Sequence, residues 1–155
     1  MSINTDITIL FVTYVPNISL LKEKIQLYKD FKIIIVDSSP NEHRVEKKIS
    51  HSNNISIYKI NNNGQGYANN IGIKSAKSKY VLYIDLDAYF DLEKVSQIYK
   101  YANDLIKWSI LVPNSNKKFL NNKIVEIDNC EASVFLVNRK VVIENAVKKI
   151  FGENM

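Results

Sequence analysis

The chain has 155 residues, of which 46% are hydrophobic and 24% charged, and this length and composition fit one ordinary globular domain. A single cysteine excludes an intrachain disulfide and a cysteine-cluster metal site, and the apolar runs are too short to cross a membrane. The net charge of +5 favours anionic partners, which could be nucleotide phosphates, anionic lipid headgroups or nucleic acid.

Short apolar runs alternate with amphipathic segments along the first half of the sequence, and this order predicts a parallel sheet covered by helices. The predicted strands are 7–14, 31–37, 55–60 and 80–84. The predicted helices are 17–28, 41–50, 66–76 and 91–106, with Asn17 and Asp91 as the N-caps of the first and the last. We therefore expect an α/β domain whose sheet is mostly parallel and flanked by helices.

The second half of the sequence is predicted to complete the same domain. Its predicted elements are strands at 108–112, 123–127 and 132–137, a polar loop at 114–122 and a terminal helix at 139–150. Neither a linker nor an internal repeat is visible between these segments. We therefore predict a single domain that covers residues 1–155.

Two aspartates two residues apart, Asp85 and Asp87, close the apolar run 80–84. In extended backbone, residues i and i+2 point to the same side, so both carboxylates can face one point in space. Hard cations such as Mg²⁺ or Mn²⁺ bind carboxylate oxygens and fill their remaining positions with substrate phosphates. The pair therefore predicts a divalent-cation site, and helix-capping or loop aspartates are the alternative interpretation.

Other polar residues stand at the carboxyl ends of predicted parallel strands, where open α/β sheets bind their ligands. Thr13 and Tyr14 end the first strand, and Asp37 and Ser38 end the second. The segment 62–72 follows the third strand, and its glycines allow close backbone approach to a ligand. The helix that begins in this segment directs free N–H groups toward an anion. A turn or helix cap is the alternative role for Asp37.

These segments, taken in order, resemble the inverting family 2 glycosyltransferases, which have the GT-A fold. The matching motifs are Val12–Val15, Val36–Ser39, Asn62–Gly64 with Asn70–Gly72, and Asp85–Asp87. The resemblance covers about residues 7 to 90, and four ordered motifs are far more specific than any one of them. It implies a Rossmann-like GT-A sheet, with a nucleotide-sugar binding half at 1–90 and an acceptor-side half at 91–155.

The resemblance also implies which residues bind the donor and the metal. The implied donor-binding residues are Thr13, Tyr14, Asp37, Ser38, Asn63, Gly64, Gly66, Asn70 and Asp85. Among them, Asp37 would accept a hydrogen bond from the base and Asp85 would lie near the ribose. Asp87, with Asp85 beside it, would hold the Mg²⁺ or Mn²⁺ ion that bridges the two phosphates and stabilises the departing nucleoside diphosphate.

The partners implied by the resemblance are a UDP- or dTDP-sugar as donor and a saccharide or lipid-linked saccharide as acceptor. The reaction would serve polysaccharide biosynthesis, and we expect no nucleic-acid partner. The N-terminus lacks a basic segment followed by an apolar core, so we expect a cytoplasmic protein, with peripheral contact at the inner face of the membrane.

The sequence departs from the family pattern at two positions of the nucleotide-sugar binding half, and its acceptor-side half is apparently incomplete. Val15 stands where asparagine is usual, and Leu86 is a bulky residue between the two aspartates. The stretch 151–154 looks like the start of the region that supplies the general base, so we expect a C-terminally truncated catalytic domain. Asp128 and Glu131 are the candidate bases within the sequence. A noncatalytic or truncated nucleotide-sugar binding module is the alternative function.

Overall fold

The computed structural model describes residues 2–50, 52–105, 108–112 and 133–144. These residues form a six-stranded sheet with the strand order β3-β2-β1-β4-β6-β5. The strands are β1 (Ile7–Thr13), β2 (Lys32–Asp37), β3 (Ile55–Lys59), β4 (Tyr80–Ile84), β5 (Ile110–Leu111) and β6 (Val134–Asn138). Neighbours among β1 to β4 pair in parallel, whereas β6 is antiparallel to both β4 and β5. The predicted mostly parallel α/β fold is confirmed.

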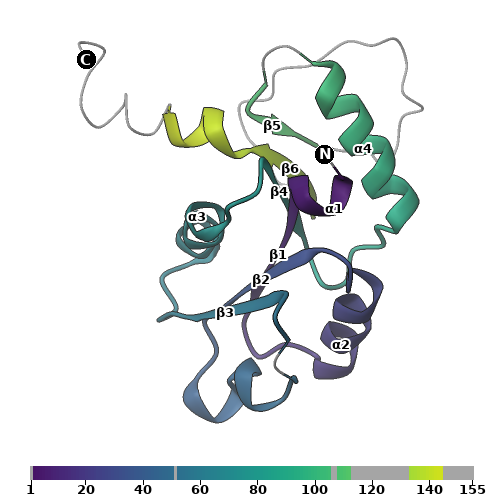
Figure 1. Ribbon diagram of the computed structural model, residues 1–155. Helices are drawn as coiled ribbons and strands as arrows, with labels where there is room; N and C mark the ends of the chain where they lie inside the picture. The colour runs from purple at the N-terminus through teal and green to yellow at the C-terminus, as the bar shows by residue number, and fades with distance from the viewer. Residues whose placement is uncertain (1, 51, 106–107, 113–132, 145–155) are drawn as a thin grey trace, which may run out of the picture.

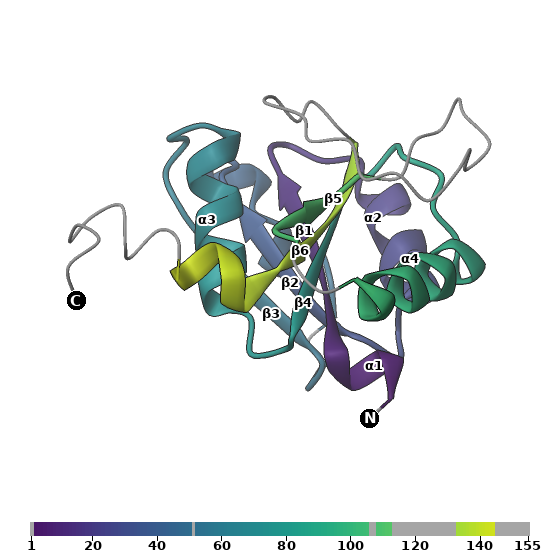
Figure 2. The same cartoon turned by 90° about the horizontal axis from the view of Figure 1, so that it is seen from above.

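Helices cover both faces of this sheet, as two perpendicular views show (Figures 1 and 2). They are α1 (Ile3–Asp6), α2 (Ile18–Leu27), α3 (Gln65–Ser75) and α4 (Leu92–Asp104), and residues 139–144 are also helical. The predicted caps are present, because the side chains of Asn17 and Asp91 accept hydrogen bonds from the amides of Leu20 and Lys94. Among the described residues, no helix is both long and apolar enough to span a membrane.

Alternate residues of the central strands pack into two hydrophobic cores, one on each face of the sheet. Ile9 and Phe11 of β1 contribute to the core beneath α2 and α4, whereas Leu10 contributes to the core beneath α3. A Cβ atom on Gly72 of α3 would lie 2.3 Å from Leu10 Cδ1, so any other residue there would have to displace the buried Leu10 side chain. This alternation is the period of two expected for strands buried on both faces.

The polar segment 41–50, predicted as a helix, instead contains two 3₁₀ turns, η1 (Asn41–His43) and η2 (Val45–Lys47). Arg44 between them has an extended backbone, with φ −54° and ψ 131°. The amide of Val45 donates 2.8 Å to the Asp37 carboxylate and is therefore unavailable to a helical carbonyl. The helix prediction was wrong because a tertiary hydrogen bond takes the donor that a continuous helix would use.

The order of the strands places a crevice at one edge of the sheet. From β1 the chain runs outward through β2 and β3, then returns to the other side of β1 to form β4. Connections that leave β1 and β4 therefore diverge at their carboxyl ends, and ligands of open α/β sheets bind at such a switch point. The predicted strand at 123–127, the loop at 114–122 and the last part of the 139–150 helix lie outside the described residues.

Candidate functional site

A pocket of about 230 Å³ opens at the carboxyl ends of β1 and β4. Its lining residues come from the ends of three strands and from the start of α3. They are Val12, Thr13, Tyr14, Ser38, Asn62, Gly64, Gln65, Ala68, Tyr83 and Asp85. A second pocket of about 170 Å³ beside β3 contains none of the predicted site residues. The first pocket thus brings together predicted residues that are more than 70 positions apart in the sequence, from Thr13 to Asp85.

Asp37 lies beneath this pocket and has no exposed surface. Its Oδ1 atom accepts hydrogen bonds from the Thr13 hydroxyl at 3.2 Å and from the Ser39 amide and hydroxyl at 3.1 and 2.6 Å. Its Oδ2 atom accepts the Val45 amide at 2.8 Å. The carboxylate therefore joins the ends of β1 and β2 to the turn η2.

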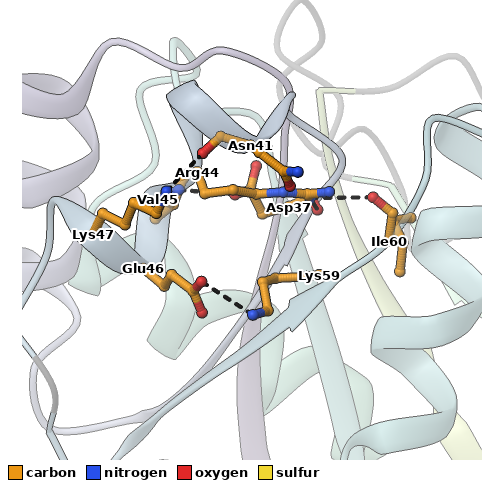
Figure 3. Close-up of polar contacts among 8 residues, drawn as sticks. All are labelled: Asp37, Asn41, Arg44, Val45, Glu46, Lys47, Lys59 and Ile60. Atoms are coloured by element: carbon orange, nitrogen blue, oxygen red, sulfur yellow. Dashed lines mark hydrogen bonds and ion pairs between the residues drawn. The ribbon is translucent and has the colours of Figure 1, made fainter.

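Arg44 extends this network to the end of β3. Its Nη1 atom donates to the carbonyl oxygens of Asp37 at 2.5 Å and Ile60 at 3.1 Å, and Figure 3 shows the Arg44 side chain reaching past Asp37 toward Ile60. The same figure shows the ion pair of Lys59 and Glu46, 3.0 Å apart, on the outer side of these strands. Arg44 therefore ties the ends of β2 and β3 together through hydrogen bonds to backbone oxygens.

The neighbouring residue, Ser38, is the one that faces the pocket. Its hydroxyl donates to the Thr13 carbonyl at 3.0 Å, and its amide donates to the same oxygen at 3.0 Å. Direct contact between Asp37 and a base stays a prediction. In this structure both oxygens of the Asp37 carboxylate already accept hydrogen bonds from protein groups.

Val15, just after β1, has a φ of 45°. A β-branched residue is a marked outlier in the left-handed region, because its Cβ substituents crowd the backbone. The Val15 amide donates 2.8 Å to the Ser39 hydroxyl, which in turn donates to Asp37. The hydrogen bonds that organise Asp37 therefore also hold the backbone of Val15 in this conformation.

Replacing Val15 with asparagine should stabilise the protein, because asparagine tolerates the left-handed region that valine resists. We expect a gain of about 1 kcal/mol, which corresponds to roughly 2 to 4 °C in melting temperature for a domain of this size. Differential scanning calorimetry would measure it. Val15→Ile, which keeps the β-branch, is the matched control and should not raise the melting temperature. A Val15→Asn variant that melts at or below the wild-type temperature would contradict the assigned strain.

The start of α3 forms the opposite wall of the pocket. Gly64, with a φ of 87°, precedes the helix and provides no side-chain cap for it. The first amides of α3 are thus without a capping side chain, and Gly64 and Gln65 line the pocket. A helix N-terminus of this kind attracts anions through its free N–H groups and its dipole.

Asp85 is linked to this wall by a chain of side-chain hydrogen bonds. Gln65 donates 2.6 Å to the Tyr83 hydroxyl, and the Tyr83 hydroxyl donates to the Asp85 carboxylate. Burial and the hydrogen bond with Asp85 raise the pKa of Tyr83, so its hydroxyl stays protonated near neutral pH and remains a donor. Tyr83 was not predicted as a site residue, and Gln65 was included only as part of segment 62–72, although Tyr83 stands at i−2 from Asp85, on the same side of a strand.

The two aspartates do not share one extended segment. β4 ends at Ile84, and a turn at Leu86 and Asp87 follows, with the Ala88 amide donating 3.1 Å to the Asp85 carbonyl. Asp85 faces the pocket, whereas Asp87 is exposed. The extended backbone expected through both aspartates is therefore absent, and their joint role as metal ligands stays a prediction.

The donor set nevertheless suits a hard divalent cation. Among the described residues, no three or more acidic, histidine or cysteine side chains form a cluster that could enclose a metal ion. Mg²⁺ is commonly held by only one or two carboxylates, with substrate phosphates and water in its other positions. Asp85, which lines the pocket with the start of α3, and the exposed Asp87 supply that number of carboxylates, and metal binding stays a prediction.

The family model for Glycosyl transferase family 2 matches residues 18–141, which is most of the chain. The chain belongs to glycosyl transferase family 2. The family and fold expected from the four motifs are thus confirmed. No curated protein matches the sequence.

Solved structures with the same fold support the assignment of a GT-A domain to this family 2 chain. TarS from S. aureus in complex with UDP-GlcNAc is 16% identical, with a TM-score of 0.63 over 92% of this chain and 48% of that one. A mannosyltransferase from Pyrobaculum calidifontis in complex with GDP-Man and Mn²⁺ is 13% identical, with a TM-score of 0.63 over 90% and 46%. The chain spans about half the length of these proteins.

Several predicted site residues of this family 2 domain are not among the residues that line the pocket. Asn63, Gly66 and Asn70 are exposed on the loop and on α3, and their contact with the donor stays a prediction. Asp128 and Glu131 lie outside the described residues.

Proposed function

We propose that this family 2 domain binds a nucleoside diphosphate sugar, of which UDP- and dTDP-sugars are the first candidates, and transfers the sugar to an acceptor hydroxyl. The observation that carries the proposal is the convergence of Thr13, Ser38, Gly64 and Asp85 in one pocket at the switch point of the sheet. The family assignment and the nucleotide sugars bound by two proteins of the same fold support it.

The pocket offers different chemistry at its two ends. Thr13 and Ser38 present polar groups on the side braced by Asp37, and we assign the base to this side. The start of α3 and the Asp85 carboxylate lie across the pocket, and we assign the ribose and diphosphate to them. Tyr14, exposed at the rim, would cover the nucleotide.

Asp85 and Asp87 would hold Mg²⁺ or Mn²⁺ there. When bound, the cation supplies positive charge to the diphosphate as negative charge grows on the departing oxygen. Asp85 is oriented for this by the hydroxyl of Tyr83, and Gln65 orients the hydroxyl. These contacts fix the carboxylate before a ligand arrives, which lowers the free-energy cost of assembling the site.

The transfer would proceed by a single displacement with inversion. The acceptor oxygen forms a bond to the anomeric carbon on one face as the bond to the diphosphate oxygen breaks on the other, and a general base takes the acceptor proton. Asp128 and Glu131 stay the candidate bases. The acceptor as a saccharide or lipid-linked saccharide, a role in polysaccharide biosynthesis, and a cytoplasmic location at the inner membrane face all stay predictions from the sequence.

Binding of a nucleoside diphosphate in the presence of Mn²⁺ tests the proposal directly. At about ten times its dissociation constant, the ligand should add roughly 1.4 kcal/mol to the free energy of unfolding and raise the melting temperature by about 3 to 6 °C. UDP, dTDP, GDP and ADP should each be titrated with Mn²⁺ and again in EDTA. If none of the four nucleotides bound in the presence of Mn²⁺, the proposed function would be wrong.

A nucleotide-sugar binding module without transferase activity is the second candidate, because the chain spans about half the length of the TarS and mannosyltransferase structures. Both candidates predict binding of the donor, so a binding assay does not separate them. Release of nucleoside diphosphate that depends on an added acceptor separates them, since only the transferase produces it.

A further inference from the structure

A buried lysine lies directly beneath the segment that carries the aspartate pair. Lys24 of α2 is only 7% exposed, and its Nζ atom donates 2.6 Å to the carbonyl oxygen of Ala88. In the described part of the chain, no carboxylate lies within 4.0 Å of this ammonium group. Burial of a charge without an ion-pair partner costs stability, and a lysine has three donors to satisfy.

Tyr28, one helical turn later, makes a parallel contact. Its buried hydroxyl donates to the carbonyl oxygen of Phe90, two residues beyond Ala88. Lys24 lies in the last turn of α2 and Tyr28 is its C-cap, so this end of the helix presents two donors to the carbonyls of Ala88 and Phe90. Burial raises the pKa of Tyr28, and the nearby charge of Asp91 adds to the effect, so the hydroxyl remains a donor near neutral pH.

These two contacts complete the anchoring of residues 85–91. At its start the Asp85 amide donates 2.7 Å to the Ser133 carbonyl beside β6, and at its end the Asp91 side chain caps α4. Lys24 and Tyr28 hold the middle of the segment from below. Asp87 is exposed, but it is adjacent in sequence to the anchored Ala88.

We propose that Lys24 and Tyr28 are positioning residues that hold segment 85–91 in the arrangement in which Asp85 and Asp87 bind a divalent cation together with the diphosphate. The proposal deepens the proposed function and rests on it. Neither side chain needs to touch the donor, because each acts through a backbone carbonyl of the segment. A hydrogen bond that orients a metal ligand from outside typically affects metal affinity by about 10- to 100-fold.

The charge of Lys24 and its positioning role have opposite effects on a cation. Removing a positive charge that contacts Ala88, the residue next to Asp87, would by itself strengthen cation binding through Coulomb's law. Loss of positioning would weaken it, because the carboxylates would have to be ordered on binding. The sign of the change in Mn²⁺ affinity therefore distinguishes the two effects.

The test compares four variants with the wild type. Lys24→Met keeps the length of the side chain but removes its charge and donor, Lys24→Gln keeps a donor without charge, and Tyr28→Phe removes one hydroxyl. Lys22→Met removes the same charge from an exposed position of the same helix and is the matched control. Mn²⁺ alone is titrated by electron paramagnetic resonance. The diphosphate that the wild type binds best among UDP, dTDP, GDP and ADP is titrated with Mn²⁺ and in EDTA.

We expect Lys24→Met and Tyr28→Phe to weaken Mn²⁺ binding and the Mn²⁺-dependent part of nucleotide affinity about 10-fold, with affinity in EDTA unchanged. Lys24→Met should melt at the wild-type temperature or above it, and Lys24→Gln should recover part of the loss. Unchanged or tighter Mn²⁺ binding in Lys24→Met, or equal losses with Mn²⁺ and in EDTA, would overturn the positioning role. A wild type that binds no nucleotide with Mn²⁺ would overturn the proposed function itself, so the two failures are distinguishable.

Discussion

Asp37→Ala is expected to lose about 4 kcal/mol of the free energy of unfolding, because four buried donors lose their acceptor and each unpaired group costs about 1 to 3 kcal/mol. The donors are the hydroxyls of Thr13 and Ser39 and the amides of Ser39 and Val45. Domains of this size are stable by only about 5 to 15 kcal/mol, so the variant would keep a small part of its stability. Urea denaturation followed by circular dichroism would measure the loss.

Two further variants show whether the cause is the lost acceptor. Asp37→Asn keeps one oxygen and should lose roughly half as much, about 2 kcal/mol. Asp87→Ala removes an aspartate that is exposed, and it should change stability by no more than about 0.5 kcal/mol. If Asp37→Ala instead unfolded at the wild-type urea concentration and only lost its preference among nucleobases, the carboxylate would contact the base rather than brace the strand ends.

Asp87→Asn is expected to show the reverse behaviour, with unchanged stability and a large loss of metal-dependent binding. An amide lacks the negative charge that a hard cation requires, so the gain in nucleotide affinity that Mn²⁺ gives the wild type should vanish. We expect a loss on the order of 100-fold, which corresponds to about 2.8 kcal/mol of binding free energy. Isothermal titration calorimetry would measure the nucleotide affinity with Mn²⁺ and the nucleotide affinity in EDTA.

Asp104→Asn is the matched control for this change, since it removes one exposed negative charge from the end of α4. It should leave nucleotide affinity unchanged within about twofold, because an exposed charge away from the pocket is screened by salt. If every nucleotide bound the wild type equally well in EDTA and with Mn²⁺, Asp85 and Asp87 would be loop residues rather than metal ligands.

The elements that could be predicted from the sequence are those whose cause is local. Runs of apolar residues predicted the strands β1, β2 and β4. The helix caps Asn17 and Asp91 could be recognised because each capping side chain accepts a hydrogen bond from an amide in the first turn of its own helix. The order of four motifs indicated the family, and the rule that ligands bind at the carboxyl ends of parallel strands indicated where Thr13, Ser38 and Asp85 would meet.

The tertiary structure decided what each of these polar residues does, because burial and hydrogen-bond partners depend on segments far apart in the chain. Asp37 and Ser38 are adjacent in the sequence, but only Ser38 lines the pocket, while Asp37 bonds to β1 and η2. The Asp37 carboxylate also accepts the Val45 amide, which a helix at 41–50 would have needed for its own hydrogen bond.

Lys24 resembles any other lysine in the sequence, yet its i+3 spacing from Leu21 places it on the buried face of α2. There the Ala88 carbonyl of the 85–91 segment accepts its hydrogen bond. Local patterns thus determined the elements and the edge of the sheet that carries the site, whereas long-range packing determined which side chains face the ligand and which hold the backbone in place.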